Sequence, residues 1–99
     1  MAQKKRYWLY SEGPLINYHP KDLREARQAA VRFVKRQGNE RVVTVVRSDG
    51  EPYAWKRNYD VIGKVAYNPM TGRYVWTAPD RPAQTEILPS GALKRRLRA

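Results

Sequence analysis

The hydrophobic period of the chain changes from helical to extended across a single glycine, and this change constrains the fold more than any other feature. Before it, apolar residues recur at three- and four-residue spacing on one face of a predicted helix: Leu23, Ala26, Ala30, Phe33 and Val34. Gly38 offers a left-handed stop, and the β-branched run 41–47 follows it. A helix with one apolar face beside a strand with two apolar faces indicates a helix packed across a sheet.

Residues typical of helix termini mark both ends of this helix, and we expect it to span about 20–37. Pro20 suits the first helical position, and Asp22 suits the positively charged first turn. Phe33 is the largest side chain on the apolar face, so Phe33→Ala is expected to be among the most damaging core substitutions.

Segments rich in aromatic and β-branched residues predict the strands of the sheet: 6–10, 41–47, 53–59, 61–67 and 73–77. Turn residues at 48–51 and 68–72 join the later strands as hairpins, and Gly63 suggests a bulge. The order of elements is β-α-β-β-β-β. We therefore predict an α+β fold, with a mostly antiparallel sheet of about five strands and one helix packed on one face.

Three prolines interrupt the pattern beyond Ala78, where we expect irregular coil: Pro79, Pro82 and Pro89. A chain of 99 residues has the size of one ordinary domain. We assign residues 1–80 to a single α+β domain with a short basic N-terminal arm. Residues 81–99 are assigned to a Pro-containing, basic C-terminal tail.

The composition excludes several classes of protein. The chain has no cysteine, which rules out disulfides, cysteine-ligated zinc and thiol catalysis. No segment approaches the ~20 apolar residues of a membrane span, and the basic start lacks the apolar stretch of a secretory signal. We expect a soluble, cytoplasmic protein that makes no membrane contact.

Positive charge dominates the chain, because 20 Lys and Arg against 9 Asp and Glu give a formal net charge of +11. Such a charge attracts polyanions, and phosphates supply much of the affinity in protein–nucleic acid complexes. The excess lies in the stretches 1–10, 21–37 and 90–99, so a helix face would form the rigid contact and the two ends flexible clamps. The residues predicted to bind nucleic acid are Lys4, Lys5, Arg6, Lys21, Arg24, Arg32, Lys35, Arg36, Lys94, Arg95, Arg96 and Arg98.

The first functional hypothesis is therefore a small, non-enzymatic basic protein that binds nucleic acid through phosphate contacts. DNA and RNA, single-stranded or double-stranded, fit this hypothesis equally.

Strand alternation sends aromatic rings to both faces of the sheet, and one helix covers only one face. The candidates for a stacking or interface surface are Tyr53, Trp55, Tyr59 and Trp76. Three interpretations remain open: a platform that stacks single-stranded bases, a core closed by a curled sheet or by the C-terminal segment, and a homodimer interface. A second functional hypothesis uses the same face, in a protein–protein interaction module, regulator or inhibitor that docks on an acidic partner.

No arrangement of residues indicates catalysis. His19 is the single histidine, and it is a neighbour of the helix start. Carboxylates such as Asp49 and Asp80 fall in predicted turns without a two-metal spacing, and the glycines form no phosphate-binding loop. We predict no enzyme activity, no catalytic residue, no metal and no cofactor.

Overall fold

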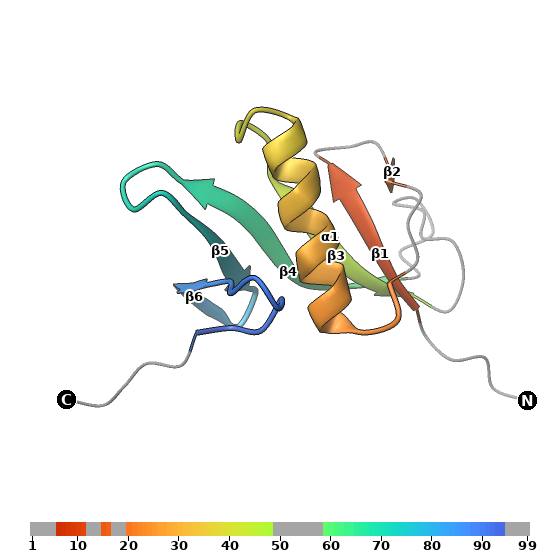
Figure 1. Cartoon of the computed structure of the whole chain (residues 1–99). Helices are drawn as coiled ribbons and strands as arrows, with labels where there is room; N and C mark the ends of the chain where they lie inside the picture. Colours follow the sequence, from red (N-terminus) through yellow and green to blue (C-terminus); the bar gives the residue numbers. More distant parts are fainter. Residues whose placement is uncertain (1–5, 12–14, 17–19, 49–58, 95–99) are drawn as a thin grey trace, which may run out of the picture.

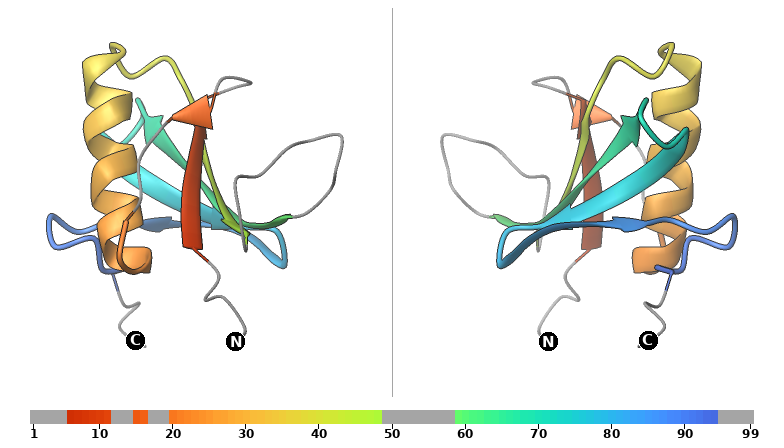
Figure 2. Two further views of the ribbon diagram at one scale, coloured as in Figure 1. Left: turned by 90° about the vertical axis from the view of Figure 1, so that its right-hand side faces the viewer. Right: turned by 90° about the vertical axis from the view of Figure 1, so that its left-hand side faces the viewer.

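One antiparallel sheet carries a single helix across one of its faces (Figures 1 and 2). The computed structural model describes residues 6–11, 15–16, 20–48 and 59–94. Within these residues six strands lie in the order β2-β1-β3-β4-β5-β6. The elements are β1 (Arg6–Ser11), β2 (Leu15–Ile16), α1 (Leu23–Arg36), β3 (Val43–Ser48), β4 (Tyr59–Asn68), β5 (Arg73–Ala78) and β6 (Arg81–Glu86).

The predicted α+β class is confirmed, and so is the packing of one helix on an antiparallel sheet. Every strand pair in the sheet is antiparallel. The predicted strand 53–59 and the hairpin loop 48–51 fall almost wholly outside the described residues. No helix of the described part is long and apolar enough to cross a membrane.

Helix α1 begins at Leu23, three residues later than the prediction that placed Pro20 at the first helical position. Asp22 is the N-cap, with an extended backbone, and its Oδ1 accepts a hydrogen bond of 2.9 Å from the backbone N–H of Glu25. A carboxylate at this position satisfies a free donor and also faces the positive end of the helix dipole. The assignment of Pro20 to the first helical position is therefore wrong. At the other end, Gly38 adopts a φ of 74°, which confirms the left-handed stop.

The inner side of α1 is built from small residues at a spacing of four. Ala26, Ala30 and Val34 are fully buried and form one core cluster with side chains of β1, β3 and β4, including Leu9 and Val45. Alanine lets the helix approach the sheet closely, because its side chain occupies little space between the two backbones. Phe33 packs against this cluster but is only half-buried, so Val34 replaces it as the deepest large side chain of the helix.

A bulge in β4 lies beside the indole ring of Trp76. Val45 pairs with Gly63 whereas Val46 pairs with Val61, so β4 contains one extra residue at this point, as the sequence predicts. A Cβ atom on Gly63 would overlap the indole ring of Trp76. The glycine therefore serves the packing of Trp76, which is 5% exposed and belongs to the core cluster.

Burial extends to the sheet face away from the helix. Trp8 and its cross-strand partner Val46 are buried, although their neighbour Leu9 points to the helix side. Val75 of β5 is buried as well. Trp8 and Trp76 are thus core residues on opposite faces, in agreement with the core interpretation of the aromatic rings.

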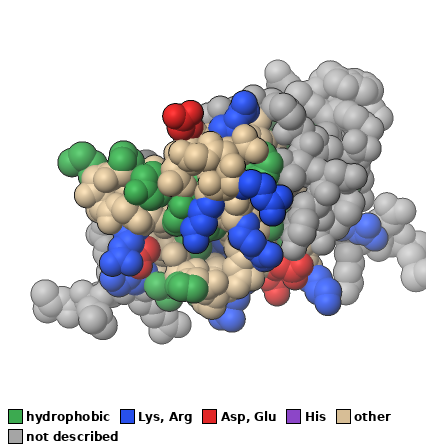
Figure 3. Space-filling model, turned by 45° about the horizontal axis from the view of Figure 1, so that its top comes forward, with side chains coloured by type: hydrophobic (Ala, Val, Ile, Leu, Met, Phe, Trp, Pro, Cys, Tyr) green, Lys and Arg blue, Asp and Glu red, His purple; other side chains and the backbone are tan. Residues whose placement is uncertain are grey.

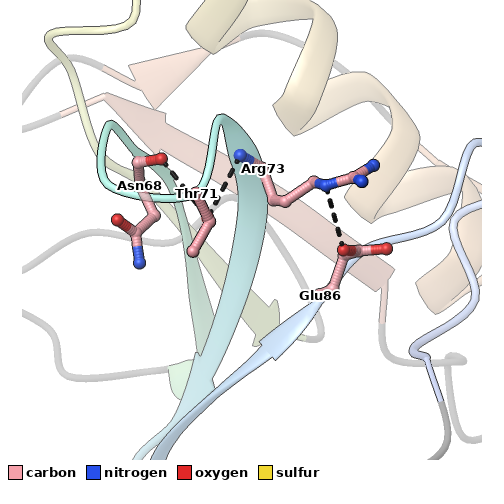
Figure 4. A network of polar contacts seen from close by, with 4 residues as sticks. All are labelled: Asn68, Thr71, Arg73 and Glu86. Carbon is pink, nitrogen blue, oxygen red and sulfur yellow. Dashed lines mark hydrogen bonds and ion pairs between the residues drawn. The ribbon is translucent and has the colours of Figure 1, made fainter.

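The hairpin between β4 and β5 follows the predicted turn chemistry. The backbone N–H of Gly72 donates to Asn68 O at 2.8 Å, and Gly72 has a φ of 71°. The Oγ1 of Thr71 bridges Asn68 and Arg73 across the turn (Figure 4). These bonds fix the start of β5, where Arg73 reaches across to Glu86 of β6.

The chain does not become irregular after Ala78, and the prediction of coil is wrong for β6. Pro82 is compatible with this strand because β6 lies at the edge of the sheet and Pro82 falls where its register with β5 is interrupted, between the pairs Trp76–Thr85 and Ala78–Arg81. Beyond β6 the chain turns back on itself, and Ile87 forms an antiparallel bridge with Leu93. Ile87 is buried in the core cluster, so residues past 80 complete the core beneath α1.

Candidate nucleic-acid interface

The outer side of α1 carries a group of exposed positive charges on one element of the described structure. Four cationic residues of the helix and one just before it are exposed, and we call them the basic face: Lys21, Arg24, Arg32, Lys35 and Arg36. Lys and Arg side chains gather over this region in Figure 3. Asp22 is engaged as the N-cap and Glu25 is half-buried, so the exposed charge on this side is mostly positive.

One arginine of the helix has a different environment. Arg27 is 9% exposed, and its guanidinium carbon lies 5.0 Å from the ring centroid of Trp76. Its NH1 group donates a buried hydrogen bond of 2.7 Å to Gly91 O. Burial, together with the charge of Arg24, lowers the pKa of Arg27 from its usual value. Arg27 therefore joins the helix to the C-terminal segment and does not belong to the basic face.

The same C-terminal segment forms one wall of a groove beside the basic face. The groove has a volume of about 520 Å³ and runs between α1, the start of β5 and residues 86–89. We call it the α1–β5 groove. Its lining residues are Gln28, Val31, Arg32, Lys35, Gly72, Arg73, Tyr74, Glu86, Ile87, Leu88 and Pro89.

Hydrogen bonds hold two walls of this groove in place. Gln28 donates from Nε2 to Pro89 O at 3.0 Å, which ties the C-terminal segment to the helix. Tyr74 donates from its hydroxyl to Asn39 Oδ1 at 2.6 Å, which ties β5 to the residues after the helix. Burial, followed by the neighbouring Tyr67, raises the pKa of Tyr74, so this hydroxyl is a stable donor at neutral pH.

Charged groups surround the apolar floor of the groove. The Nζ of Lys35 lies 5.2 Å from the ring centroid of Tyr74. On the opposite wall Arg73 Nε lies 3.5 Å from Glu86 Oε1 (Figure 4). This is the one ion pair recorded within the groove lining, and it neutralises the carboxylate there.

The other predicted binding residues are spread over the molecule or fall outside the described chain. Arg6 is exposed at the start of β1, and Lys94 is exposed where the described chain ends beyond the Ile87–Leu93 bridge. Five of the predicted residues lie outside the described residues: Lys4, Lys5, Arg95, Arg96 and Arg98.

The predicted aromatic surface is not assembled by the residues that the structure describes. Trp76 is buried under α1, so it is unavailable for stacking or for an interface. Tyr59 is half-buried, with its ring centroid 5.9 Å from that of Tyr10. Tyr53 and Trp55 lie outside the described residues.

Sequence reasoning identified the basic face but missed the groove. The groove needs residues 86–89 as a wall, and these were expected to be part of an irregular tail. Two adjacent apolar residues between Pro82 and Pro89, Ile87 and Leu88, are the feature of the sequence that could have indicated packing of this segment on the domain. Among the described residues, no group of three or more His, Cys, Asp or Glu side chains is placed to hold a metal ion.

Comparison with known proteins places the chain in no established group: no family model matches it, and neither a curated protein nor a solved structure does.

Proposed function

We propose that the protein binds nucleic acid, with the basic face of α1 contacting successive phosphates. The observation that carries the proposal is the concentration of exposed cations on one rigid element, from Lys21 to Arg36. A helix of 14 residues is about 21 Å long, which spans several phosphates of a nucleic-acid strand. The inner side of the same helix is buried in the core, so its cations are presented without a large loss of backbone freedom on binding.

Salt dependence gives the first test. If the five cations of the basic face each neutralise one phosphate of a duplex, the association constant should fall roughly 500-fold between 50 and 200 mM salt. Fluorescence anisotropy with labelled 20-nucleotide probes measures this for duplex DNA, single-stranded DNA and single-stranded RNA. Micromolar or weaker binding to all three probes at 50 mM salt would contradict the proposal.

A pair of triple variants separates the basic face from charge in general. Lys21→Gln, Arg24→Gln and Arg36→Gln remove three cations of the basic face that do not line the groove. Arg41→Gln, Lys64→Gln and Arg81→Gln remove the same charge from exposed positions elsewhere. We expect the first variant to weaken binding at 50 mM salt at least tenfold more than the second. Equal weakening would mean that the basic face has no special role.

The second hypothesis, docking on an acidic partner through the aromatic sheet face, receives no comparable support from the described residues. Trp76 is buried, and Tyr59 is the one described member of that set with an accessible part.

A further inference from the structure

The α1–β5 groove combines an apolar floor with cationic walls, and we infer that it holds one nucleotide of a single-stranded nucleic acid, with its base on the floor and a phosphate at the rim. This inference rests on the proposed function and names the class of nucleic acid that it would bind. A volume of about 520 Å³ falls in the range of small-molecule sites in proteins.

The floor is apolar and preformed. Ile87 is 8% exposed and is held by its bridge to Leu93, while Val31 and Leu88 are half-buried beside it. The polar groups next to the floor are already occupied, because Pro89 O accepts from Gln28 and the Tyr74 hydroxyl donates to Asn39. A flat base that covers these side chains would remove apolar surface from water without displacing a hydrogen bond.

The cationic side chains at the edge of the groove, which we call its rim, favour binding of an anion. Arg32 and Lys35 stand on the helix wall, and Arg73 stands on the β5 wall. Lys35 is held over the Tyr74 ring, so its ammonium group lies at the groove. Glu86 is the one carboxylate among the lining residues, and its ion pair with Arg73 leaves a positive balance. The phosphate of the nucleotide, which is joined to the base through the sugar, would be attracted by this excess of positive charge.

The apolar floor favours a single strand over a duplex. The bases of a duplex are stacked inside, so a base would reach the floor only after flipping out of its stack, at a cost of a few kcal/mol. A single strand has unstacked bases available. The phosphates on either side of the bound nucleotide would then extend over the basic face, because Arg32 and Lys35 belong to both surfaces.

The first experiment compares two single-stranded 12-nucleotide DNA probes with the same phosphates. One is oligothymidylate, and the other carries abasic tetrahydrofuran units throughout. We expect the base-bearing probe to bind about tenfold more tightly, and methyl NMR signals of Val31, Ile87 and Leu88 to shift with that probe alone. Equal affinity of the two probes would overturn the inference while leaving the proposed function intact. Failure of both probes to bind at low salt would also overturn the inference, and the proposed function would fall with it only if duplex DNA and single-stranded RNA failed to bind as well.

A matched pair of variants tests the groove itself. Val31→Glu places a carboxylate on the floor, and Ala29→Glu adds the same charge at another half-buried position of α1 outside the groove. We expect Val31→Glu alone to abolish the preference for the base-bearing probe. Circular dichroism establishes whether each variant is folded, and the methyl NMR titration of the unmodified protein decides the question if one is not.

An acidic peptide is the competing occupant. A decaglutamate peptide is expected to leave the three methyl signals unchanged and to compete only with phosphate binding on the basic face. If it shifts the same methyl signals as oligothymidylate, with equal or higher affinity, the groove is a protein-docking site and the inference is overturned.

Discussion

Arg27 and Arg32 are five residues apart on α1, and their positive charges have different environments on the two sides of the helix. Arg27 is buried against Trp76 and bonded to Gly91 O, whereas Arg32 is exposed at the rim of the groove. The first orients the C-terminal segment, and the second is free to meet a ligand. The comparison teaches that the formal charge of a helix overstates the charge that it offers to a partner.

The largest expected effect comes from placing a charge on the inner side. Ala30 is fully buried, so Ala30→Lys would bury an ammonium group without a partner, at a cost of several kcal/mol. This is comparable to the whole stability of a small domain, and we expect the variant not to fold. Thermal unfolding followed by circular dichroism measures it, with the exposed Gln37→Lys as the control. A cooperative transition near that of the unmodified protein would contradict the assigned inner side.

A smaller effect should follow from loosening the contact between the helix and the C-terminal segment. Gly91 has a φ of 85°, and a Cβ atom there would overlap the backbone carbonyl of Arg24. We expect Gly91→Ala to cost about 3 kcal/mol, from backbone strain and from the overlap. Gly38 also has a positive φ but has open space around it, so Gly38→Ala should cost only about 1 kcal/mol. Equal costs in urea unfolding would show that the segment does not pack as described.

The smallest effect, and the most direct comparison, comes from the two arginines themselves. Arg27→Ala removes a charged hydrogen bond and a cation–π contact, and we expect it to lower the free energy of unfolding by about 2 kcal/mol. Arg32→Ala should change that free energy by less than about 0.5 kcal/mol, yet weaken nucleic-acid binding severalfold. Urea denaturation and anisotropy of both variants provide the test. The opposite pattern would reverse the roles given to the two sides.

The elements that could be predicted from the sequence are those with a clear period. The spacing of Ala26, Ala30 and Val34 predicts the inner side of α1, and the β-branched run before Ser48 predicts a central strand. The bulge beside Gly63 was also predictable, because glycine inside a strand pattern marks such sites.

What the sequence could not reveal depends on long-range contacts. Pro82 argues against a strand unless the strand is known to lie at an edge, and only the assembled sheet shows that. Trp76 and Tyr74 are two residues apart in β5, so they lie on the same face of the strand. Exposed aromatic residues would show the same spacing, and the burial of these two depends on which face α1 covers. The groove was unpredictable for the same reason, since its walls come from three separated segments.

The edges of the sheet have a consequence for the behaviour of the protein when its charge is neutralised. Self-repulsion from a net charge of +11 keeps free molecules apart, but a bound polyanion would cancel it and bring several copies together. Long, flat edge strands would then pair with one another and seed aggregates. At one edge, β6 contains Pro82, and the backbone N–H of Lys94 donates to Glu86 O at its end. The interrupted edge at β6 therefore opposes strand-to-strand aggregation under the crowding that a bound polyanion would create.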